Sequence, residues 1–145
     1  MARLIDRITL GMRANEAGAP VAKLVGFRPT SVEDGKAVFE LEAGPQHANP
    51  MGTLHGGVLC DVADAAMGVA YASTLGEGES FTTLELKINF LRPFRTGKLI
   101  ANAHLVKGGR TIGLVECDVT DTEGRLVARA MSTCMTLRGD ASEGR

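Results

Sequence analysis

The stretch HANPMGTLHGGVLCDVADAAMGVAYA, residues 47–72, decides the fold, because it opens with His-Gly-Gly and continues as a long apolar run. From Gly56 to about Leu75 the run is apolar on nearly every side of a helix, which is typical of a helix that other elements bury. The sequence GEGES at 76–80 ends it. Small residues would let another backbone lie close against this helix: Ala63, Ala65, Ala66, Gly68, Ala70 and Ala72.

Two carboxylates lie inside this apolar run, Asp61 in its second turn and Asp64 in its third. Each residue of a helix is turned by about 100° from the one before it. On that basis, six residues lie within roughly 60° of one line along the helix surface: Gly57, Cys60, Asp61, Asp64, Gly68 and Tyr71. An unpaired carboxylate in an apolar wall costs on the order of several kcal/mol. A carboxylate one turn from the helix start suits the helix dipole, which accounts for Asp61. Asp64 lies too deep for that explanation.

Two interpretations of these aspartates are open. In the functional one, an aspartate acts as general base or nucleophile beside backbone donors that hold an oxyanion, and desolvation raises its pKa. In the structural one, the aspartates accept hydrogen bonds from loop backbone or pair with arginine across a subunit contact. We expect the helix to begin at or just after His55, so that the first free N–H groups belong to Gly56 and Gly57. Neither glycine has a Cβ, and a ligand can therefore come close.

The rest of the chain predicts an N-terminal helix followed by strands. Residues 2–14 place apolar side chains on one stripe, and the helical segment occupies about residues 1–18. The sequence LVGFRPTSVEDGKAVFELEA, 24–43, predicts a hairpin around a Glu-Asp-Gly turn. Its second arm alternates polar residues with four apolar ones, as a half-buried strand does: Ala37, Phe39, Leu41 and Ala43.

The second half predicts strands throughout. In TTLELKINFLRP, 82–93, Leu84, Leu86, Ile88 and Phe90 alternate with polar residues. KLIANAHLVK, 98–107, and RTIGLVECDVTD, 110–121, form a hairpin around the two-residue turn 108–109, and RLVARAMSTCMTL, 125–137, is the last strand. Residues 138–145 are expected to be a flexible tail.

These elements predict a single α+β domain spanning residues 1–145, with an antiparallel sheet curled round the long helix. A single sheet of this kind leaves long strand edges, and such edges pair readily with a second copy of the chain.

Composition excludes several classes of partner. Sixteen Lys and Arg against 17 Asp and Glu leave no electrostatic footprint for nucleic acid and no basic face for an anionic membrane. Three cysteines without a CxxC spacing are expected to be reduced core thiols. The N-terminus lacks the apolar core of a cleaved signal, and no apolar run reaches about 18 residues. We therefore expect a cytoplasmic protein.

The residues NPMGTLHGG, from Asn49 to Gly57, with an acidic residue nine positions after the histidine, carry a family resemblance. With the Phe-Leu-Arg-Pro strand end and the helix-in-curled-sheet pattern, roughly residues 20–137 resemble the hotdog-fold acyl-CoA thioesterases of the PaaI-like, phenylacetate-pathway branch. The resemblance implies a hotdog fold and hydrolysis of an acyl-CoA thioester, with coenzyme A entering as part of the substrate and no cofactor or metal.

Position by position, the resemblance implies roles for five residues. Asp64 matches the catalytic carboxylate, and the Gly56 N–H matches the oxyanion donor. Asn49 matches the residue that orients water or substrate, and His55 matches the histidine lining the carbonyl pocket. Thr83 matches a Ser or Thr that positions water near the carboxylate of its own subunit. Strand alternation, however, places Thr83 on the face opposite Leu84 and Leu86, so that its side chain misses the pocket unless the strand twists or the partner chain lies on that face.

The resemblance also implies that the site is shared between subunits, the His-Gly-Gly turn of one facing the aspartate helix of its partner. A homodimer is then required for catalysis, and a homotetramer is the usual assembly. Gly57 allows close approach of the substrate, and Asp61 lies beside it on the same helix face. A related branch acting on hydroxynaphthoyl-CoA typically carries Glu where Asp64 stands, so the aspartate here favours other acyl groups.

Other candidate groups have a structural alternative. Lys107 and Arg110 flank the Gly-Gly turn and, with Arg92, are candidates for the phosphates of coenzyme A; the alternative is solvated charges on an ordinary turn. A metal site could be imagined from His47, His55, Asp61 and Asp64, but their spacing matches no HExxH-type pattern. We expect His104 at the surface or in an interface. Cys60 has no base at helical spacing to activate it, which favours a packed thiol.

The sequence thus predicts hydrolysis of an aryl- or fatty-acyl-CoA. Two alternatives stay open. The first is an acyl-CoA or lipid-binding module without turnover, and the second is a hydratase or dehydratase on the same fold.

Overall fold

The computed structural model describes residues 2–13 and 19–144, and residues 1, 14–18 and 145 lie outside the described part. Its elements follow in chain order: α1 (Leu4–Arg13), α2 (Pro20–Val25), β1 (Phe27–Glu33), β2 (Lys36–Ala43), η1 (Pro45–His47), α3 (Gly56–Ala72), β3 (Ser80–Phe90), β4 (Gly97–Gly108), β5 (Ile112–Asp121), β6 (Leu126–Leu137) and η2 (Gly139–Ser142).

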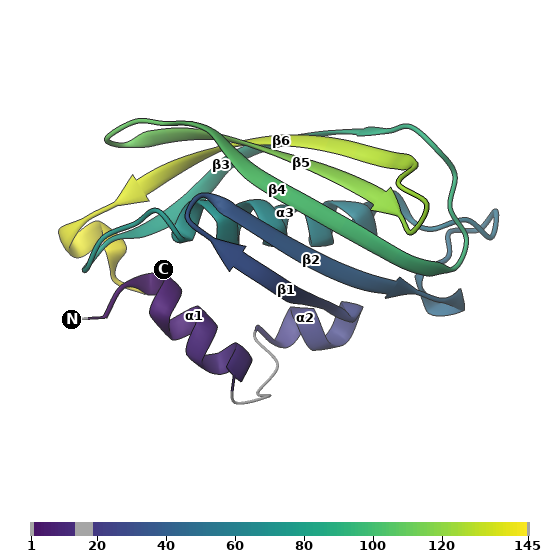
Figure 1. Cartoon of the computed structure of the whole chain (residues 1–145), viewed down its shortest axis with the longest axis horizontal. Coiled ribbons are helices and arrows are strands. Elements are labelled where there is room, and N and C mark those ends of the chain that lie inside the picture. The colour runs from purple at the N-terminus through teal and green to yellow at the C-terminus, as the bar shows by residue number, and fades with distance from the viewer. Residues whose placement is uncertain (1, 14–18, 145) are drawn as a thin grey trace.

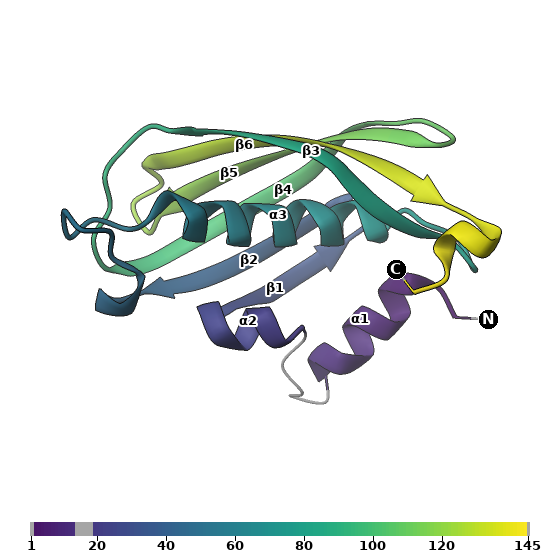
Figure 2. The same cartoon turned by 180° about the vertical axis from the view of Figure 1, so that it is seen from behind.

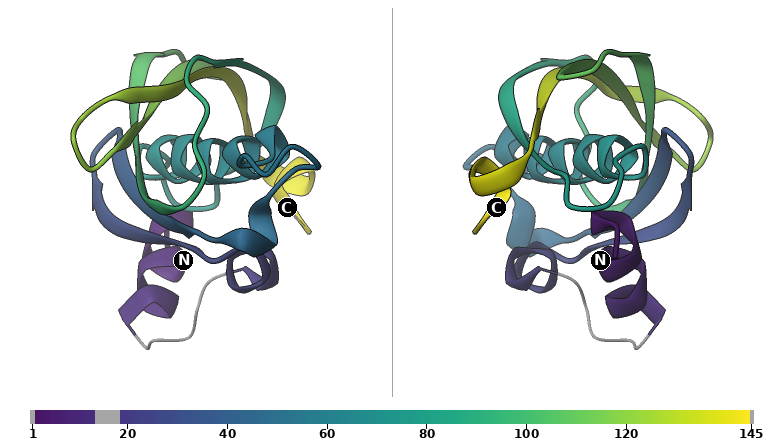
Figure 3. Two further views of the ribbon diagram at one scale, coloured as in Figure 1. Left: turned by 90° about the vertical axis from the view of Figure 1, so that its right-hand side faces the viewer. Right: turned by 90° about the vertical axis from the view of Figure 1, so that its left-hand side faces the viewer.

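The six strands form one sheet in the order β1-β2-β4-β5-β6-β3, and every neighbouring pair is antiparallel. The sheet curls round α3, which is seen best along the helix axis (Figure 3). Helices α1 and α2 lie beside the β1 edge (Figure 1). The predicted curled antiparallel sheet around a long central helix, with an N-terminal helix, is confirmed.

Alternation along the strands produces the core. In β2 the four predicted inward residues are at most 4% exposed, and Leu41 is fully buried. They face the apolar side of α3, where Val62, Ala63, Ala66 and Met67 are fully buried. Burying a Leu or Met side chain contributes about 1.5–3 kcal/mol to folding, which makes this contact a main source of stability.

Helix α3 is open on one side, contrary to the expectation that it is buried all round. Asp61 and Asp64 are exposed in the single chain, and Figure 2 shows their helix lying across the concave face of the sheet between the edge strands β1 and β3. The C-terminal part of the same side is closed. There the Phe81 ring lies over Gly68, and the buried Tyr71 hydroxyl lies 2.7 Å from Thr136 Oγ1.

The helix ends at Ala72, earlier than the predicted Leu75, because Ser73 caps it. The Ser73 hydroxyl donates to the Ala70 carbonyl at 2.6 Å and accepts the Gly35 N–H at 2.8 Å. These bonds satisfy a helix-end carbonyl and tie the helix to the β1–β2 turn.

Strand β3 contains a β-bulge at Leu84. Thr83 pairs with Cys134 and Glu85 with Thr133, so Leu84 has no partner in β6. One extra residue reverses the alternation on its N-terminal side. The prediction that Leu84 shares the face of Leu86, opposite Thr83, was therefore wrong. Thr83 points to the same side as Leu86, and Leu84 is 52% exposed.

The β4–β5 hairpin is confirmed, but its turn lies two residues later than predicted. The Gly109 N–H donates to the Ile112 carbonyl at 2.8 Å, which leaves Arg110 and Thr111 as the turn residues. A bulge at Val106 accompanies this shift, because Leu105 pairs with Val115 and Lys107 with Leu114.

The N-terminal region contains a second helix that the sequence analysis missed. The predicted helix is α1, and part of the predicted segment 1–18 falls outside the described residues. Helix α2 begins with Pro20 and ends at Gly26, whose φ of 97° suits glycine. At the C-terminus Arg138 pairs with Glu79 at 2.6 Å and η2 follows; the flexible tail stays a prediction.

Two further observations bear on the class of protein. Within the described ranges, no helix is long and apolar enough to cross a membrane. The same residues hold no group of three or more His, Cys, Asp or Glu that could bind a metal ion. Cys117 and Cys134 are buried free thiols, and burial raises the pKa of Cys117 to about 12.

Candidate active site

The start of α3 presents one unused backbone donor. His55 is the N-cap, and its Nδ1 accepts the Gly57 N–H at 2.8 Å. The Val58 N–H donates to the His55 carbonyl at 3.0 Å. Among the described residues, no acceptor lies within hydrogen-bonding range of the Gly56 N–H. This amide, at the positive end of the helix dipole, can hold a developing oxyanion.

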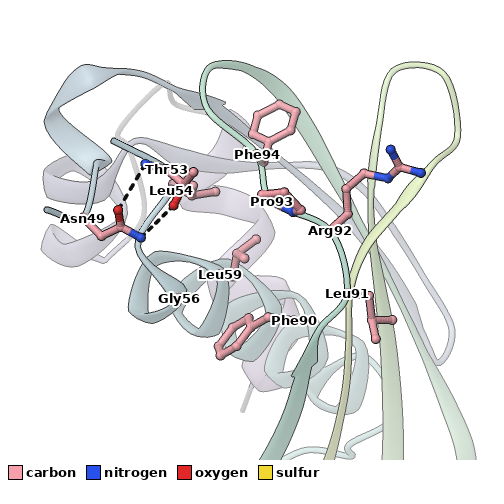
Figure 4. A pocket seen from close by; sticks show the side chains of 10 residues that line it. All are labelled: Asn49, Thr53, Leu54, Gly56, Leu59, Phe90, Leu91, Arg92, Pro93 and Phe94. Atoms are coloured by element: carbon pink, nitrogen blue, oxygen red, sulfur yellow. Dashed lines mark hydrogen bonds between the residues drawn. The ribbon is translucent and has the colours of Figure 1, made fainter. Parts of the chain in front are cut away.

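A pocket of about 350 Å³ opens at this amide. Figure 4 shows Leu59 and Phe90 close to Gly56, with Arg92 at the rim pointing away from it. The full lining is Asn49, Thr53, Leu54, Gly56, Leu59, Phe90, Leu91, Arg92, Pro93 and Phe94. The pocket therefore combines apolar walls with the free amide of Gly56, as a site for an apolar carbonyl compound does.

Packing explains both glycines at the helix start. A Cβ on Gly56 would lie 2.7 Å from Cζ of Phe90, and a Cβ on Gly57 would lie 2.9 Å from Nδ1 of His55. Gly56 thus lets the Phe90 ring lie over the helix start, and Gly57 lets the His55 ring reach its capping position. The presence of glycine at position 57 is therefore explained by packing as well as by the predicted close approach of a substrate.

Asn49 closes the loop that leads into the helix. Its Oδ1 accepts the N–H groups of Met51 and Thr53 at 3.0 and 3.1 Å, and its Nδ2 donates to Thr53 Oγ1 at 2.8 Å. The amide retains one further N–H for a ligand in the pocket that it lines. The Asn49 side chain therefore mainly stabilises the loop. Its remaining N–H hydrogen is the one that can make the predicted contact with water or substrate.

Asp64 pairs with Thr83 away from this pocket. Thr83 Oγ1 donates a hydrogen bond to Asp64 Oδ1 at 3.5 Å. The bulge at Leu84 makes this bond possible, because it turns Thr83 toward α3. Desolvation raises the pKa of Asp64, the hydrogen bond from Thr83 opposes that rise, and the negative charge of Asp61 adds to it. A carboxylate with a raised pKa is a stronger base, as general base catalysis requires.

The Gly56 amide and the Asp64 carboxylate of one chain cannot act on the same carbonyl group. Asp64 follows Gly56 by eight residues on the same helix, which separates them by about 12 Å along the axis at 1.5 Å per residue. A thioester carbonyl needs its base and its oxyanion donor each within roughly 3 Å. Asp64 does not line the pocket at Gly56. Within a single chain, the Asp64 carboxylate and the free Gly56 amide are therefore too far apart to act on one carbonyl group.

Comparison with known proteins identifies the family. Residues 51–128 match the model of the Thioesterase superfamily, which is more than half of the chain. The chain belongs to the thioesterase superfamily. It is a thioester hydrolase with the hotdog fold that the sequence predicted.

Several relatives of this thioesterase are known. It is 30% identical to mouse acyl-coenzyme A thioesterase 13 over 68% of this chain and 71% of that protein. It is 31% identical to the 1,4-dihydroxy-2-naphthoyl-CoA hydrolase of Listeria monocytogenes over 75% of this chain and 89% of that one. The PaaI protein of the E. coli phenylacetic acid degradation operon superposes with a TM-score of 0.81 at 26% identity, covering 93% of this chain and 94% of that one. The PaaI-like resemblance is confirmed.

The remaining predicted residues of the thioesterase are dispersed. Asp61 is exposed on the open side of α3, one turn before Asp64. Lys107 lies before the β4–β5 turn and Arg110 within it. This turn contacts Tyr71, so both residues are at the opposite end of α3 from Gly56. Only Arg92 reaches the pocket. Any phosphate contact of Lys107 or Arg110 stays a prediction that requires a neighbouring chain.

Of two other titratable groups of the thioesterase, His104 lies at the surface as predicted, whereas Cys60 is only partly buried and is not the core thiol that the sequence predicted. His104 is exposed, and its Nε2 lies 3.6 Å from Glu116. Desolvation and the charges of Asp61 and Asp64 raise the pKa of Cys60, which disfavours its thiolate. Phe90 and His47 are the two residues at this end of the molecule whose place the sequence analysis missed. Phe90 was expected only as one of the alternating apolar residues of its strand, and His47 is buried.

Proposed function

We propose that this thioesterase hydrolyses acyl-CoA thioesters at sites shared between subunits, Asp64 of one chain acting with the Gly56 N–H of another. The observation that carries the proposal is the split of the site. One helix bears both a carboxylate with a raised pKa and a free N-terminal amide, about 12 Å apart along its axis. A second copy that lays its helix start beside Asp64 would bring both groups to one carbonyl.

The open side of α3 and the edges of the sheet support such an assembly. β3 is an edge strand, and its Leu84 and Phe90 are 52% and 55% exposed. Exposed edges and apolar side chains favour pairing with another copy. A homodimer is therefore the smallest complete enzyme in this proposal, and a homotetramer would contain the same shared sites.

The chemistry follows from these two groups. The Asp64 carboxylate accepts a proton from water, whose oxygen adds to the thioester carbon. Negative charge then develops on the carbonyl oxygen, where the Gly56 N–H and the helix dipole stabilise it. Collapse of this intermediate breaks the carbon–sulfur bond, and the proton held by Asp64 passes to the coenzyme A thiolate. The Thr83 hydroxyl keeps the carboxylate in place beside the water.

A nucleophilic variant of the mechanism uses the same residues. There Asp64 adds to the carbonyl carbon, coenzyme A leaves, and water hydrolyses the resulting mixed anhydride. In a single turnover in ¹⁸O-water the general-base route places the label only in the product acid. The nucleophilic route places label in Asp64 when water attacks the carboxyl carbon of that side chain.

The substrate class is supported by the pocket and by the relatives. Acyl-coenzyme A thioesterase and dihydroxynaphthoyl-CoA hydrolase are the names of relatives about 30% identical to this chain. Apolar walls from Leu54, Leu59, Phe90 and Phe94 suit an aryl or fatty acyl group. Arg92 at the rim is placed to meet an anionic part of the same substrate.

The test is thiol release from a panel of aryl- and fatty-acyl-CoAs by Asp64→Asn and Asp64→Ala. Losing an essential base typically costs about 10²–10⁴ in rate. Asp34→Asn is the matched control, because Asp34 lies in the β1–β2 turn, where Asn-Gly is as favourable as Asp-Gly. Activity of both Asp64 variants within a few-fold of wild type would exclude the mechanism. If the wild type binds acyl-CoA tightly without turnover, the protein is instead an acyl-CoA-binding module. If it adds water to an enoyl-CoA, it is a hydratase.

A further inference from the structure

The buried imidazole of His47 joins two distant segments of the chain. The residue is 7% exposed, and both ring nitrogens are engaged. Nδ1 accepts the Gly44 N–H at 3.0 Å, and Nε2 lies 2.6 Å from the carbonyl oxygen of Val25 at the end of α2. Because Nδ1 is an acceptor, Nε2 carries the hydrogen and donates it to Val25. The ring thus ties the end of α2 to the corner that follows β2.

The backbone of His47 continues this link to the active site. Its carbonyl accepts the N–H of His55 at 2.9 Å, and His55 immediately precedes Gly56 and caps α3. Next to it, Leu54 donates to the Phe94 carbonyl at 2.7 Å. The connection between β2 and α3 contains the short η1 and an isolated bridge between Ala48 and Leu54, and these bonds and the Asn49 turn fix its course. The direction of the Gly56 N–H depends on that course.

We propose that His47 is a positioning residue for the oxyanion donor. Its imidazole holds the loop base against α2, and its carbonyl holds the Leu54–His55 peptide, one peptide before the one that carries the Gly56 N–H. The proposal rests on the shared-site mechanism above, because only there does the direction of the Gly56 N–H affect the rate. Misplacing a group by about 1 Å can cost on the order of 10²-fold in rate, and a loop with little regular structure depends on such bonds to hold its groups in place.

Two isosteric variants separate the two ring bonds. In His47→Asn the amide oxygen can take the place of Nδ1 and accept the Gly44 N–H, while the donor to Val25 is lost. In His47→Gln the amide nitrogen can take the place of Nε2 and donate to Val25, while the acceptor is lost. Each variant keeps a polar group in the buried site and one of its two partners, so one can fold where the other does not. His104→Gln, on the exposed outer side of β4, is the matched control.

The experiment measures kcat and KM for thiol release from one acyl-CoA, with the chemical shifts of the Gly56 and Gly57 amides recorded in parallel. We expect kcat to fall about tenfold or more in a folded variant, with KM within about threefold, because oxyanion donors act mainly on the transition state. The two glycine amides shift in His47 variants and not in His104→Gln. A folded variant with wild-type kcat and unshifted glycine amides would overturn the proposal.

Asp64→Asn, assayed in the same series, separates this outcome from failure of the proposed function. If Asp64→Asn is inactive while a folded His47 variant has wild-type kcat, only the positioning role is wrong. If Asp64→Asn keeps its activity, the hydrolytic mechanism on which the positioning role depends is wrong.

Discussion

The hydroxyl of Thr83 reaches across from an edge strand to the central helix and donates a hydrogen bond to the carboxylate of Asp64 at 3.5 Å. Regular alternation in β3 would have turned Thr83 to the other side of the sheet. The unpaired Leu84 reverses the alternation between Thr83 and Leu86, and both then face α3. A bulge thus turns the Thr83 side chain toward the carboxylate that serves as the base in the proposed mechanism.

The neighbours of Asp64 predict opposite shifts in the pH dependence of activity. A general base works only when ionised, so kcat/KM falls as the pH falls through the pKa of Asp64. The bond from Thr83 lowers that pKa and the charge of Asp61 raises it. In Thr83→Val the acid limb of the kcat/KM profile moves to higher pH, and in Asp61→Asn it moves to lower pH. Shifts in the same direction would contradict this assignment.

Asp64 is also predicted to reduce stability at neutral pH. Its pKa in the folded chain is raised by desolvation, so the folded state binds this proton more tightly than the unfolded state does. The protonated form of Asp64 therefore contributes stability at pH values below the pKa of Asp64 in the unfolded chain. This contribution is lost as the pH rises through the higher pKa of Asp64 in the folded chain. Asp64→Asn should therefore melt at an equal or higher temperature than wild type at pH 7, with the difference shrinking at acid pH. A lower melting temperature at pH 7 would contradict the prediction.

The Gly56 amide can be removed without removing the helix. Proline is tolerated at the first helical position, and His55 has the extended φ and ψ that a residue before proline prefers. Because any Cβ at 56 meets Phe90, the test is made in a Phe90→Ala background. We expect Gly56→Pro to lower kcat by about 10²–10³, as loss of an oxyanion donor does. Gly56→Ala in the same background keeps the N–H and should keep most of the activity.

Cys60 is predicted to be dispensable. Its thiolate is disfavoured by desolvation and by two nearby carboxylates, and no reaction step uses it. Cys60→Ala should retain kcat within about threefold, since a small packed side chain is replaced by a smaller one. Loss of activity with an unchanged melting temperature would indicate a nucleophilic thiol.

Leu41 provides a prediction for the core. It is fully buried on β2, where the alternation with Lys36, Glu40 and Glu42 places it against α3. Leu41→Ala should lower the free energy of unfolding by about 2–5 kcal/mol. Denaturant unfolding measures this loss, and a loss below about 1 kcal/mol would contradict the packing described for that strand.

The spacing of apolar residues and the residue types found in turns made much of the fold predictable. The alternation of Ala37, Phe39, Leu41 and Ala43 specifies one buried face, and the Glu-Asp-Gly turn specifies the hairpin. The apolar run after His55 specifies the central helix. Each of these signals lies within a short window of sequence.

What the sequence did not predict depends on contacts between distant segments. The bulge at Leu84 has no local marker, because its register is set by β6. The Gly-Gly pair suggested a turn at 108–109, but pairing of Gly109 with Ile112 moves the turn to Arg110 and Thr111. The burial of His47 depends on Val25, 22 residues away, which no spacing rule connects to it.

The most direct test of the shared site is complementation between two inactive chains. Asp64→Asn and the double variant Gly56→Pro/Phe90→Ala are co-expressed, and thiol release is compared with each chain alone. In a mixed dimer one site combines the intact Asp64 of one chain with the intact Gly56 of the other. Random assembly then restores about a quarter of wild-type activity. Co-expression of Asp64→Asn with Asp64→Ala should restore none, and an absence of recovery in the first pair would contradict a site built from two subunits.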